Sequence, residues 1–442
     1  MKKLFRTATV LLAATMLLSI ACFAGDFTAL ADELHDMKMF LGTDAGYELD
    51  KVPTRAQAAV MLVRLLGQEE YAKGAYASAA ITNPFVDAAV DWAAPSIAYL
   101  YSNGLTNGMG KNEHGEPVFG MYSDCSAQMY STFLLRALGY KDTGDQPDFS
   151  YAGAVDFAKG KGVADDLLLN ETFSRDTLVA ASYQALSLPV KDGSGMLLEK
   201  LISSGAIDAA AAADSLAKMK AYRKIADATQ TMNGLSAADF TINIAATLGD
   251  PLNTNYSLVT DMQYTGGEKT QYAMLFTIDS SGQKMQGGQW YKDGWTYTLD
   301  FYGNATKMKS DSTTDSLQET LSAAETGSGA LYMFDGWTSR TENGMTCYSF
   351  NLASGFFDAV QQQAGEQLSG LGMQYTINKA TLEYWLNGNG ALVSSVVTVD
   401  MTLTTDNVSI PAQSIVKLTV NATGDKVVVE YPDLSKFVET AQ

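Results

Sequence analysis

The pattern of hydrophobic and polar residues changes once along the chain, near residue 237. Before this point apolar residues recur at helical spacing, and after it apolar and polar residues alternate with a period of two. Helical spacing places the apolar side chains on one face of a helix, and alternation places them on one face of a strand. The sequence therefore predicts a multidomain α+β chain, with an all-α first part and a mainly antiparallel β second part that contains a few helices.

A capped helix recurs three times in the first part. In its clearest copy, residues 53–67, Thr54 is a candidate N-cap and Gly67 is a stop signal. Another helix and a glycine-containing turn precede each copy. Self-similarity of this kind is the signature of a repeat architecture. We expect three repeats within residues 25–208, with bounds of about 27–80, 81–145 and 146–208.

The three copies differ at the start of the capped helix. In the second copy Ser126 stands opposite Thr54, and Ala127 stands opposite Arg55. The third and weakest copy keeps an arginine, Arg175, at this position. At most two of the three repeats therefore have a cation directly after the cap.

These repeats resemble the S-layer homology family. The residues that carry the resemblance are Pro53-Thr-Arg-Ala-Gln57, Phe85-Val-Asp87, Trp92-Ala and Gly104-Leu-x-x-Gly108. The resemblance covers about residues 27–208 and implies a three-pronged helical bundle. It also implies that grooves between the prongs bind secondary cell-wall polysaccharide, which is often pyruvylated. The family has Glu where this chain has Gln57.

The resemblance implies a set of polymer-binding residues: Thr54, Arg55, Gln57, Trp92, Gly104, Gly108 and Arg175. An acidic sugar suits a planar arginine at a helix start, where unpaired N–H groups also face outward. The alternative for Arg55 and Arg175 is pairing with neighbouring acids. Trp92 is either a sugar-stacking platform or, as we favour, a core side chain. Gly104 and Gly108 are first of all turn formers.

Residues 209–236 predict a helical linker, because they are rich in strong helix formers. The β-rich domain then covers residues 237–442. Its expected strands are 240–246, 256–264, 272–278, 289–299, 346–351, 381–386, 393–404, 414–421 and 426–431. Helices are expected near 315–324 and 355–368.

This second domain resembles, more loosely, the half-barrels of periplasmic lipoprotein carriers. The resemblance rests on the segment 288–297, the strand pair across Asn387–Gly390 and the closing segment 431–436. It implies a concave sheet face that holds an apolar ligand. The alternative for the aromatic residues on these strands, which we favour, is one face of a core.

The N-terminus predicts export. Lys2, Lys3 and Arg6 precede an apolar run and small residues, as in a signal peptide. We expect cleavage after Ala24, so that residues 1–24 are removed; cleavage at Ala31, a lipidated Cys22 and an uncleaved anchor are alternatives. The expected location is outside the cell, at the cell wall or cell surface.

Charge and residue types narrow the functional classes. The net charge of −19 argues against nucleic acid as a partner. The chain has two histidines and no His-based catalytic or zinc motif, so we expect no enzyme activity, metal or cofactor. Paired carboxylates leave an anchored glycan hydrolase as the alternative. We expect Cys125 and Cys347 to be buried thiols without a disulfide.

Overall fold

The computed structural model describes residues 27–89, 92–169, 173–267, 270–310, 329–357, 374–405 and 408–440. The predicted signal peptide, the predicted helix at 315–324 and most of that at 355–368 lie outside these ranges. Within them the chain forms two compact units. The helical unit contains residues 27–220 together with Ala330–Tyr332, and the sheet unit contains 221–329 and 333–440. The boundary between the units therefore lies inside the predicted linker.

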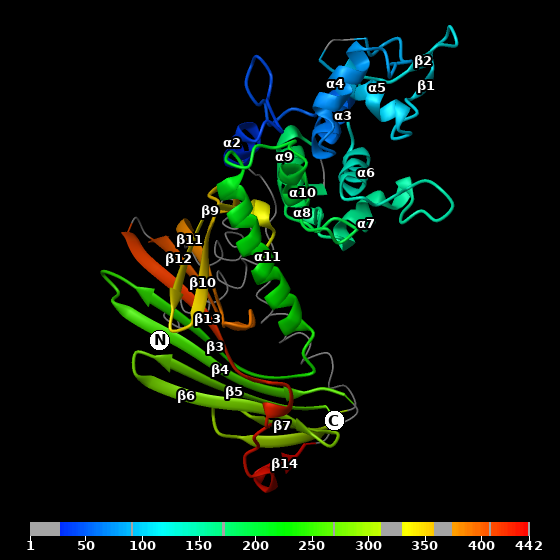
Figure 1. Cartoon of the computed structure of the whole chain (residues 1–442). Helices are drawn as coiled ribbons and strands as arrows, with labels where there is room; N and C mark the ends of the chain where they lie inside the picture. The colour runs from blue at the N-terminus through cyan, green and yellow to red at the C-terminus, as the bar shows by residue number, and fades with distance from the viewer. Residues whose placement is uncertain are drawn as a thin grey trace. The chain divides into compact units, whose positions relative to one another are not determined.

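The helical unit places the predicted capped helices where the sequence indicates them (Figure 1). Its helices are α2 (Thr28–Asp36), α3 (Arg55–Leu65), α4 (Glu69–Ala77), α5 (Ala94–Ser102), α6 (Ala127–Ala137), α7 (Ala154–Gly160), α8 (Asp166–Leu169), α9 (Arg175–Leu186) and α10 (Leu197–Ser203). A short antiparallel pair, β1 (Gly110–Lys111) and β2 (Pro117–Val118), lies in the loop before α6. The expectation of a purely α-helical unit is therefore wrong at this hairpin.

Helix α9 is the centre of the helical unit. Every residue of α9 from Arg175 to Leu186 is buried. A helix that is covered on all sides is a core element rather than a surface helix. Because α9 has no solvent-exposed polar face, the sequence pattern of the third copy of the repeat is weak.

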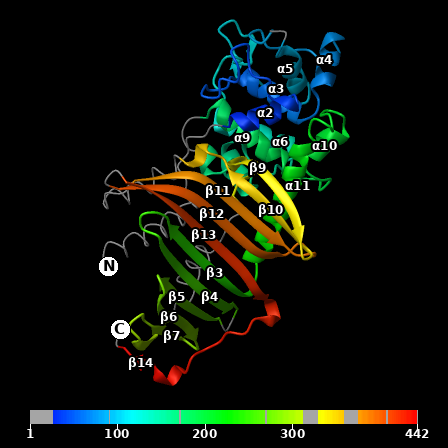
Figure 2. The ribbon, with the colours of Figure 1, turned by 90° about the vertical axis from the view of Figure 1, so that its left-hand side faces the viewer.

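The described residues of the sheet unit form one sheet of twelve strands, most of which can be followed in Figure 2. Its strands are β3 (Ala237–Leu248), β4 (Thr254–Thr265), β5 (Gln271–Ser280), β6 (Gln283–Lys292), β7 (Trp295–Leu299), β8 (Ala305–Lys309), β9 (Phe334–Glu342), β10 (Met345–Leu352), β11 (Gln374–Leu386), β12 (Leu392–Thr405), β13 (Val408–Thr423) and β14 (Val438–Glu439). Their order is β14-β8-β7-β6-β5-β4-β3-β13-β12-β11-β10-β9. Neighbouring strands are antiparallel except β14 and β8, so the predicted mainly antiparallel sheet is confirmed.

The strands differ from the prediction in three respects. The predicted strand 289–299 is two strands, β6 and β7, which turn at Asp293-Gly294. The predicted strand 426–431 has no strand structure; a short 3-10 helix, Gly424–Lys426, precedes an extended segment. Strands β8, β9 and β14 have no counterpart among the predicted strands.

One face of the sheet is buried. The cluster at its centre contains Phe240, Met262, Tyr272, Met274 and Leu418, against which Met232 and Leu235 pack. Met232 lies in α11 (Ala213–Asn233), whose residues from 221 onward belong to the sheet unit. The alternating apolar residues thus form a core face, as the period of two predicts.

The aromatic residues of the strands divide between the core and its margin. Trp290 and Tyr384 are buried, whereas the other predicted aromatic positions are half-buried: Tyr291, Trp295, Tyr297, Trp337 and Trp385. Cys125 and Cys347 are free and buried, as expected. In the described part of the chain no helix combines the length and hydropathy needed to cross a membrane.

Candidate binding site at Arg55

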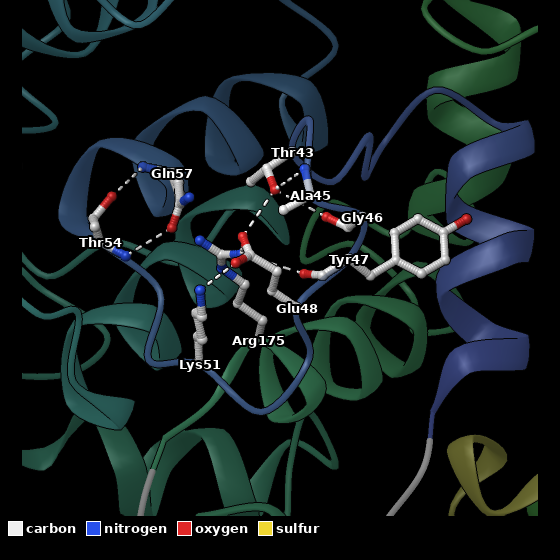
Figure 3. A network of polar contacts seen from close by, with 9 residues as sticks. All are labelled: Thr43, Ala45, Gly46, Tyr47, Glu48, Lys51, Thr54, Gln57 and Arg175. Carbon is white, nitrogen blue, oxygen red and sulfur yellow. Dashed lines mark hydrogen bonds and ion pairs between the residues drawn. The ribbon is translucent and has the colours of Figure 1, made fainter.

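The first turn of α3 is held by a capping box. The Thr54 hydroxyl accepts a hydrogen bond from Gln57 N at 3.3 Å, and Thr54 N donates to Gln57 Oε1 at 2.9 Å (Figure 3). The predicted N-cap at Thr54 is confirmed. Gln57, where the S-layer homology family has Glu, supplies the acceptor oxygen that the box requires. Both side chains therefore fix the helix start that positions Arg55.

The first backbone N–H groups of α3 are not open to a ligand. Arg55 N donates to the carbonyl oxygen of Ser123 at 2.9 Å, and Ala56 N donates to that of Met121 at 3.2 Å. The loop before α6 thus covers the helix start. The expectation that unpaired N–H groups face the ligand is wrong here, and the guanidinium is the group that remains.

The Arg55 guanidinium is half-buried, and its direct contacts are uncharged groups. Its Nε donates to the carbonyl oxygen of Phe119 at 3.0 Å, its Nη1 contacts Met129 Sδ at 3.2 Å, and its Cζ lies 4.9 Å from the centre of the Phe119 ring. Across the described ranges no carboxylate forms an ion pair with Arg55. Burial lowers the pKa of Arg55, while Cys125, Tyr151 and Asp87 raise it. The result is a partly desolvated cation, and some of its N–H groups have no partner among the residues that the structure describes.

Asp87 fixes the loop that faces Arg55. Its carboxylate accepts hydrogen bonds from the backbone N–H groups of Phe119, Gly120 and Met121, at 2.7, 2.7 and 3.3 Å. The Phe85 ring packs at 5.6 Å from that of Phe119. The Phe85-Val-Asp87 motif therefore acts as a positioning element.

Two exposed aromatic side chains, Tyr122 and Tyr151, are linked to this site, the first through the loop before α6 and the second through its electrostatic effect on Arg55. Tyr122, between the two residues whose carbonyls cover the start of α3, is 73% exposed. Tyr151, which acts on the pKa of Arg55, is 46% exposed. Trp92 is 54% exposed, so the favoured prediction that it is a core side chain is wrong. Sugar rings stack on exposed aromatic faces of this kind.

Arg175 lies in different surroundings. Its Nη1 donates to Glu48 Oε2 at 2.9 Å and to the carbonyl oxygen of Tyr47 at 3.3 Å (Figure 3). Lys51 and Thr43 also bond to Glu48, and these partners lower its pKa to about 2, with Lys51 as the largest cause, followed by Arg175. For Arg175 the structure therefore agrees with the alternative given above, in which the arginine pairs with a neighbouring acid.

Gly104 and Gly108 form turns. Both have positive φ angles, +68° and +72°, which L-residues adopt rarely. A Cβ atom on Gly108 would lie 2.4 Å from Phe85 Cε1 and 2.5 Å from the carbonyl oxygen of Val118. Gly108 is therefore needed for close packing against the Phe85 motif.

The structure brings together only part of the predicted set. Thr54, Arg55 and Gln57 share the first turn of α3, and Arg175 belongs to a separate network. Several other groups of these two sites were not predicted from the sequence: Glu48, Phe119, Tyr122 and Tyr151. One signal was present, because Tyr47 and Phe119 stand the same number of residues before the caps Thr54 and Ser126.

The chain has limited similarity to known proteins. No protein-family model matches the chain. The chain is 32% identical over 170 residues to a cell surface protein of Thermoanaerobacter kivui. The matched part is 38% of this chain and 21% of the relative, so the chain spans about a fifth of the length of the relative that it matches.

Two solved structures align with part of the chain. LprF from Mycobacterium bovis aligns over 97% of its length with 48% of this chain, at 12% identity and a TM-score of 0.27. A LolA superfamily protein from Nitrosomonas europaea aligns over 96% of its length with 46% of this chain, at 8% identity and a TM-score of 0.16. Similarities at such TM-scores do not establish a shared fold, so the sheet is described by its own strand order.

Proposed function

We propose that the protein is held at the cell surface by non-covalent binding of an acidic wall polysaccharide to its helical unit, with Arg55 as the binding cation. The observation that carries this proposal is the state of Arg55. Its guanidinium is partly desolvated, bonds to a backbone carbonyl and has no carboxylate partner in the described structure. Partial burial of a charge is unfavourable unless the charge is paired, so the site favours an external anion.

The chemistry around Arg55 favours an acidic sugar over a simple anion. A guanidinium binds a carboxylate through two parallel hydrogen bonds, and a ketal-linked pyruvate presents such a carboxylate on a sugar ring. Tyr122 and Tyr151 expose aromatic surface on which a sugar ring stacks. The similarity to a protein described as a cell surface protein supports the location. We propose that the repeats act as S-layer homology repeats in this sense.

The experiment measures the affinity of the purified protein for immobilised, pyruvylated wall polysaccharide. We expect Arg55→Ala to weaken binding roughly tenfold or more, because a hydrogen bond to a charged group contributes about 1.5–3 kcal/mol. Arg55→Lys keeps the charge but loses the planar pair of donors, so it should restore only part of the affinity. Arg223→Ala removes a cation from the sheet unit and is the matched control.

The outcome that contradicts the proposal is equal affinity of the wild type and Arg55→Ala. Binding that falls equally in Arg55→Ala and Arg223→Ala would also contradict it, because it would show a general effect of charge. Circular dichroism of each variant shows whether the fold is retained.

The proposal assigns a binding role and no catalysis to the chain. The anchored glycan hydrolase stays an untested alternative; incubation with wall glycans and measurement of new reducing ends test it. The apolar ligand of the sheet unit also stays a prediction, tested by native mass spectrometry of the purified protein.

A further inference from the structure

Two loops of the helical unit hold the starts of two capped helices in the same way. Arg175 N donates to the carbonyl oxygen of Lys51 at 2.8 Å and Asp176 N to that of Leu49 at 2.9 Å. These bonds repeat those that Arg55 N and Ala56 N make to the loop before α6. The backbone alone therefore aligns the loop 47–51 with the loop 119–123.

The side-chain contacts follow the same alignment. The carbonyl oxygen of Tyr47 accepts from Arg175, and the carbonyl oxygen of Phe119 accepts from Arg55. In this alignment the next residues, Glu48 and Gly120, occupy equivalent positions. Both have positive φ angles, +50° and +73°. The two arginine sites are thus structural copies that differ at this residue.

The difference decides what each arginine contacts. Glu48 extends its carboxylate to Arg175 Nη1 at 2.9 Å, and Arg175 is only 8% exposed. Gly120 has no side chain, and the sulfur of Met109 lies over it, 2.2 Å from the place of a Cβ atom. Met109 is 55% exposed and unbranched, so it moves at little cost.

The backbone at Glu48 indicates that this contact is held against strain. A non-glycine residue in the left-handed region is strained by its Cβ atom, and glycine avoids this strain. The chain has glycine at position 120 and glutamate at position 48. The bonds of Glu48 to Arg175, Lys51 and Thr43 offset the strain.

We propose that Glu48 is an internal ligand of Arg175. Its carboxylate takes the position beside Arg175 that a carboxylate of the wall polymer takes beside Arg55. This inference rests on the proposed function and states which of the equivalent sites is active. The third equivalent position is Ala127, which has no cation. The protein therefore binds one acidic sugar, at Arg55, and a second site is closed by its own glutamate.

The test counts binding sites by isothermal titration calorimetry. The ligand is a methyl hexoside that carries a pyruvyl ketal, and the same hexoside without the ketal is the control. We expect one site in the wild type and two sites in Glu48→Gly, which places at position 48 the residue found at position 120. Adding Arg175→Ala to Glu48→Gly should return the number to one.

The reciprocal change closes the site at Arg55. Because a Cβ atom at position 120 would meet the sulfur of Met109, the variant is Gly120→Glu combined with Met109→Ala. We expect this double variant to bind no ligand, whereas Met109→Ala alone binds as the wild type does. Circular dichroism confirms the fold of each protein.

The outcomes separate the two proposals. One site in both the wild type and Glu48→Gly overturns the internal ligand and leaves the proposed function intact. No site in either protein overturns the proposed function and the internal ligand together. A second site in Glu48→Gly that persists after Arg175→Ala overturns the assignment to Arg175.

Discussion

Two arginines at the same position of their repeats differ in whether a carboxylate bonds to them directly. Arg175 is buried and bonded to Glu48, while Arg55 is half-buried against the carbonyl and ring of Phe119. One residue makes this difference, because Glu48 stands where the other loop has Gly120. The charge that is open to a ligand thus depends on the facing loop rather than on the arginine itself.

The network around Glu48 predicts a pH-dependent contribution to stability. Lys51, Arg175 and Thr43 hold the pKa of Glu48 at about 2, below its ordinary value of 4.5. The folded protein binds this proton less tightly than the unfolded chain does. The contribution is therefore fully present above about pH 4.5 and is lost as the pH falls towards 2.

We expect the difference in unfolding free energy between the wild type and Glu48→Gln to be largest at neutral pH and to shrink across this window. Urea denaturation at a series of pH values measures it. Glu113→Gln removes a carboxylate from an exposed loop of the same unit and is the charge control. Identical pH profiles for both variants would refute the role of the network.

Close packing at Gly108 predicts a loss of stability that Gly104 does not share. An alanine at either position is strained by about 1–2 kcal/mol because φ is positive. At Gly108 the new Cβ atom also overlaps Phe85 and Val118, which adds about 1–3 kcal/mol, whereas nothing lies within 4 Å at Gly104. Thermal unfolding should show Gly108→Ala as the less stable variant; equal midpoints would contradict this account.

At the scale of elements, the start of α3 depends on its capping box. We expect Thr54→Ala to cost about 1 kcal/mol of unfolding free energy, because the N–H of Gln57 loses its acceptor. Thr54→Ser keeps the hydroxyl and should be close to the wild type. Chemical denaturation compares the three proteins, and an unchanged Thr54→Ala would show that the cap does not hold the helix.

The elements that the sequence predicted well carry either a clear period or a clear cap. The central strands β3 and β4 alternate because each buries a single face, whereas the capped helices are marked by Thr54, Ser126 and Ser174 at their starts. Strand β9 was not predicted. It lies at the edge of the sheet and is mostly exposed after its first residues, so it has no alternation of apolar and polar residues.

The segment 426–431 was predicted as a strand but does not form one. Its run of valines is typical of a strand, yet Val429 and Tyr431 pack against the cluster of Trp290 and Phe437. Tyr431 also donates to the carbonyl oxygen of Tyr291, and Glu430 N donates to the side chain of Gln263. The apolar residues bury surface against the sheet without joining its ladder, which periodicity alone does not reveal.

At the scale of the whole molecule, the helical unit includes a segment from the second half of the chain. Leu331 and Tyr332 are buried within this unit. Leu331 N donates to Gln184 Oε1 at 2.9 Å, the Tyr332 hydroxyl donates to Asp165 Oδ2 at 2.6 Å, and the Tyr332 ring packs edge-on against Phe27. The helical unit is thus complete only with residues 330–332.

We expect Tyr332→Ala to destabilise the helical unit by about 3–5 kcal/mol, the usual cost of removing a buried aromatic side chain. Hydrogen exchange followed by mass spectrometry should show faster exchange in α2 and α9. Tyr302→Ala removes a tyrosine that is 93% exposed and should leave exchange unchanged. Unaltered protection of α2 and α9 in Tyr332→Ala would show that the segment is dispensable.

The candidate site was predictable only in part. The spacing of Thr54, Arg55 and Gln57 placed them on one helix turn, and the structure confirms the cap. The state of each arginine was not predictable, because it depends on a loop that belongs to a different repeat: the loop of Phe119 for Arg55 and the loop of Glu48 for Arg175. A pattern within one repeat contains no information about which loop faces it.

The most direct test of the account is a double-mutant cycle between Arg55 and the acidic group of the polymer. Affinities are measured for wild type and Arg55→Ala, each with pyruvylated polysaccharide and with polysaccharide from which the pyruvate has been removed. If Arg55 binds that carboxylate, removing both the arginine and the pyruvate weakens binding no more than removing either one. The coupling free energy between them is then roughly 1.5–3 kcal/mol. If the two losses simply multiply, Arg55 does not bind the acidic group.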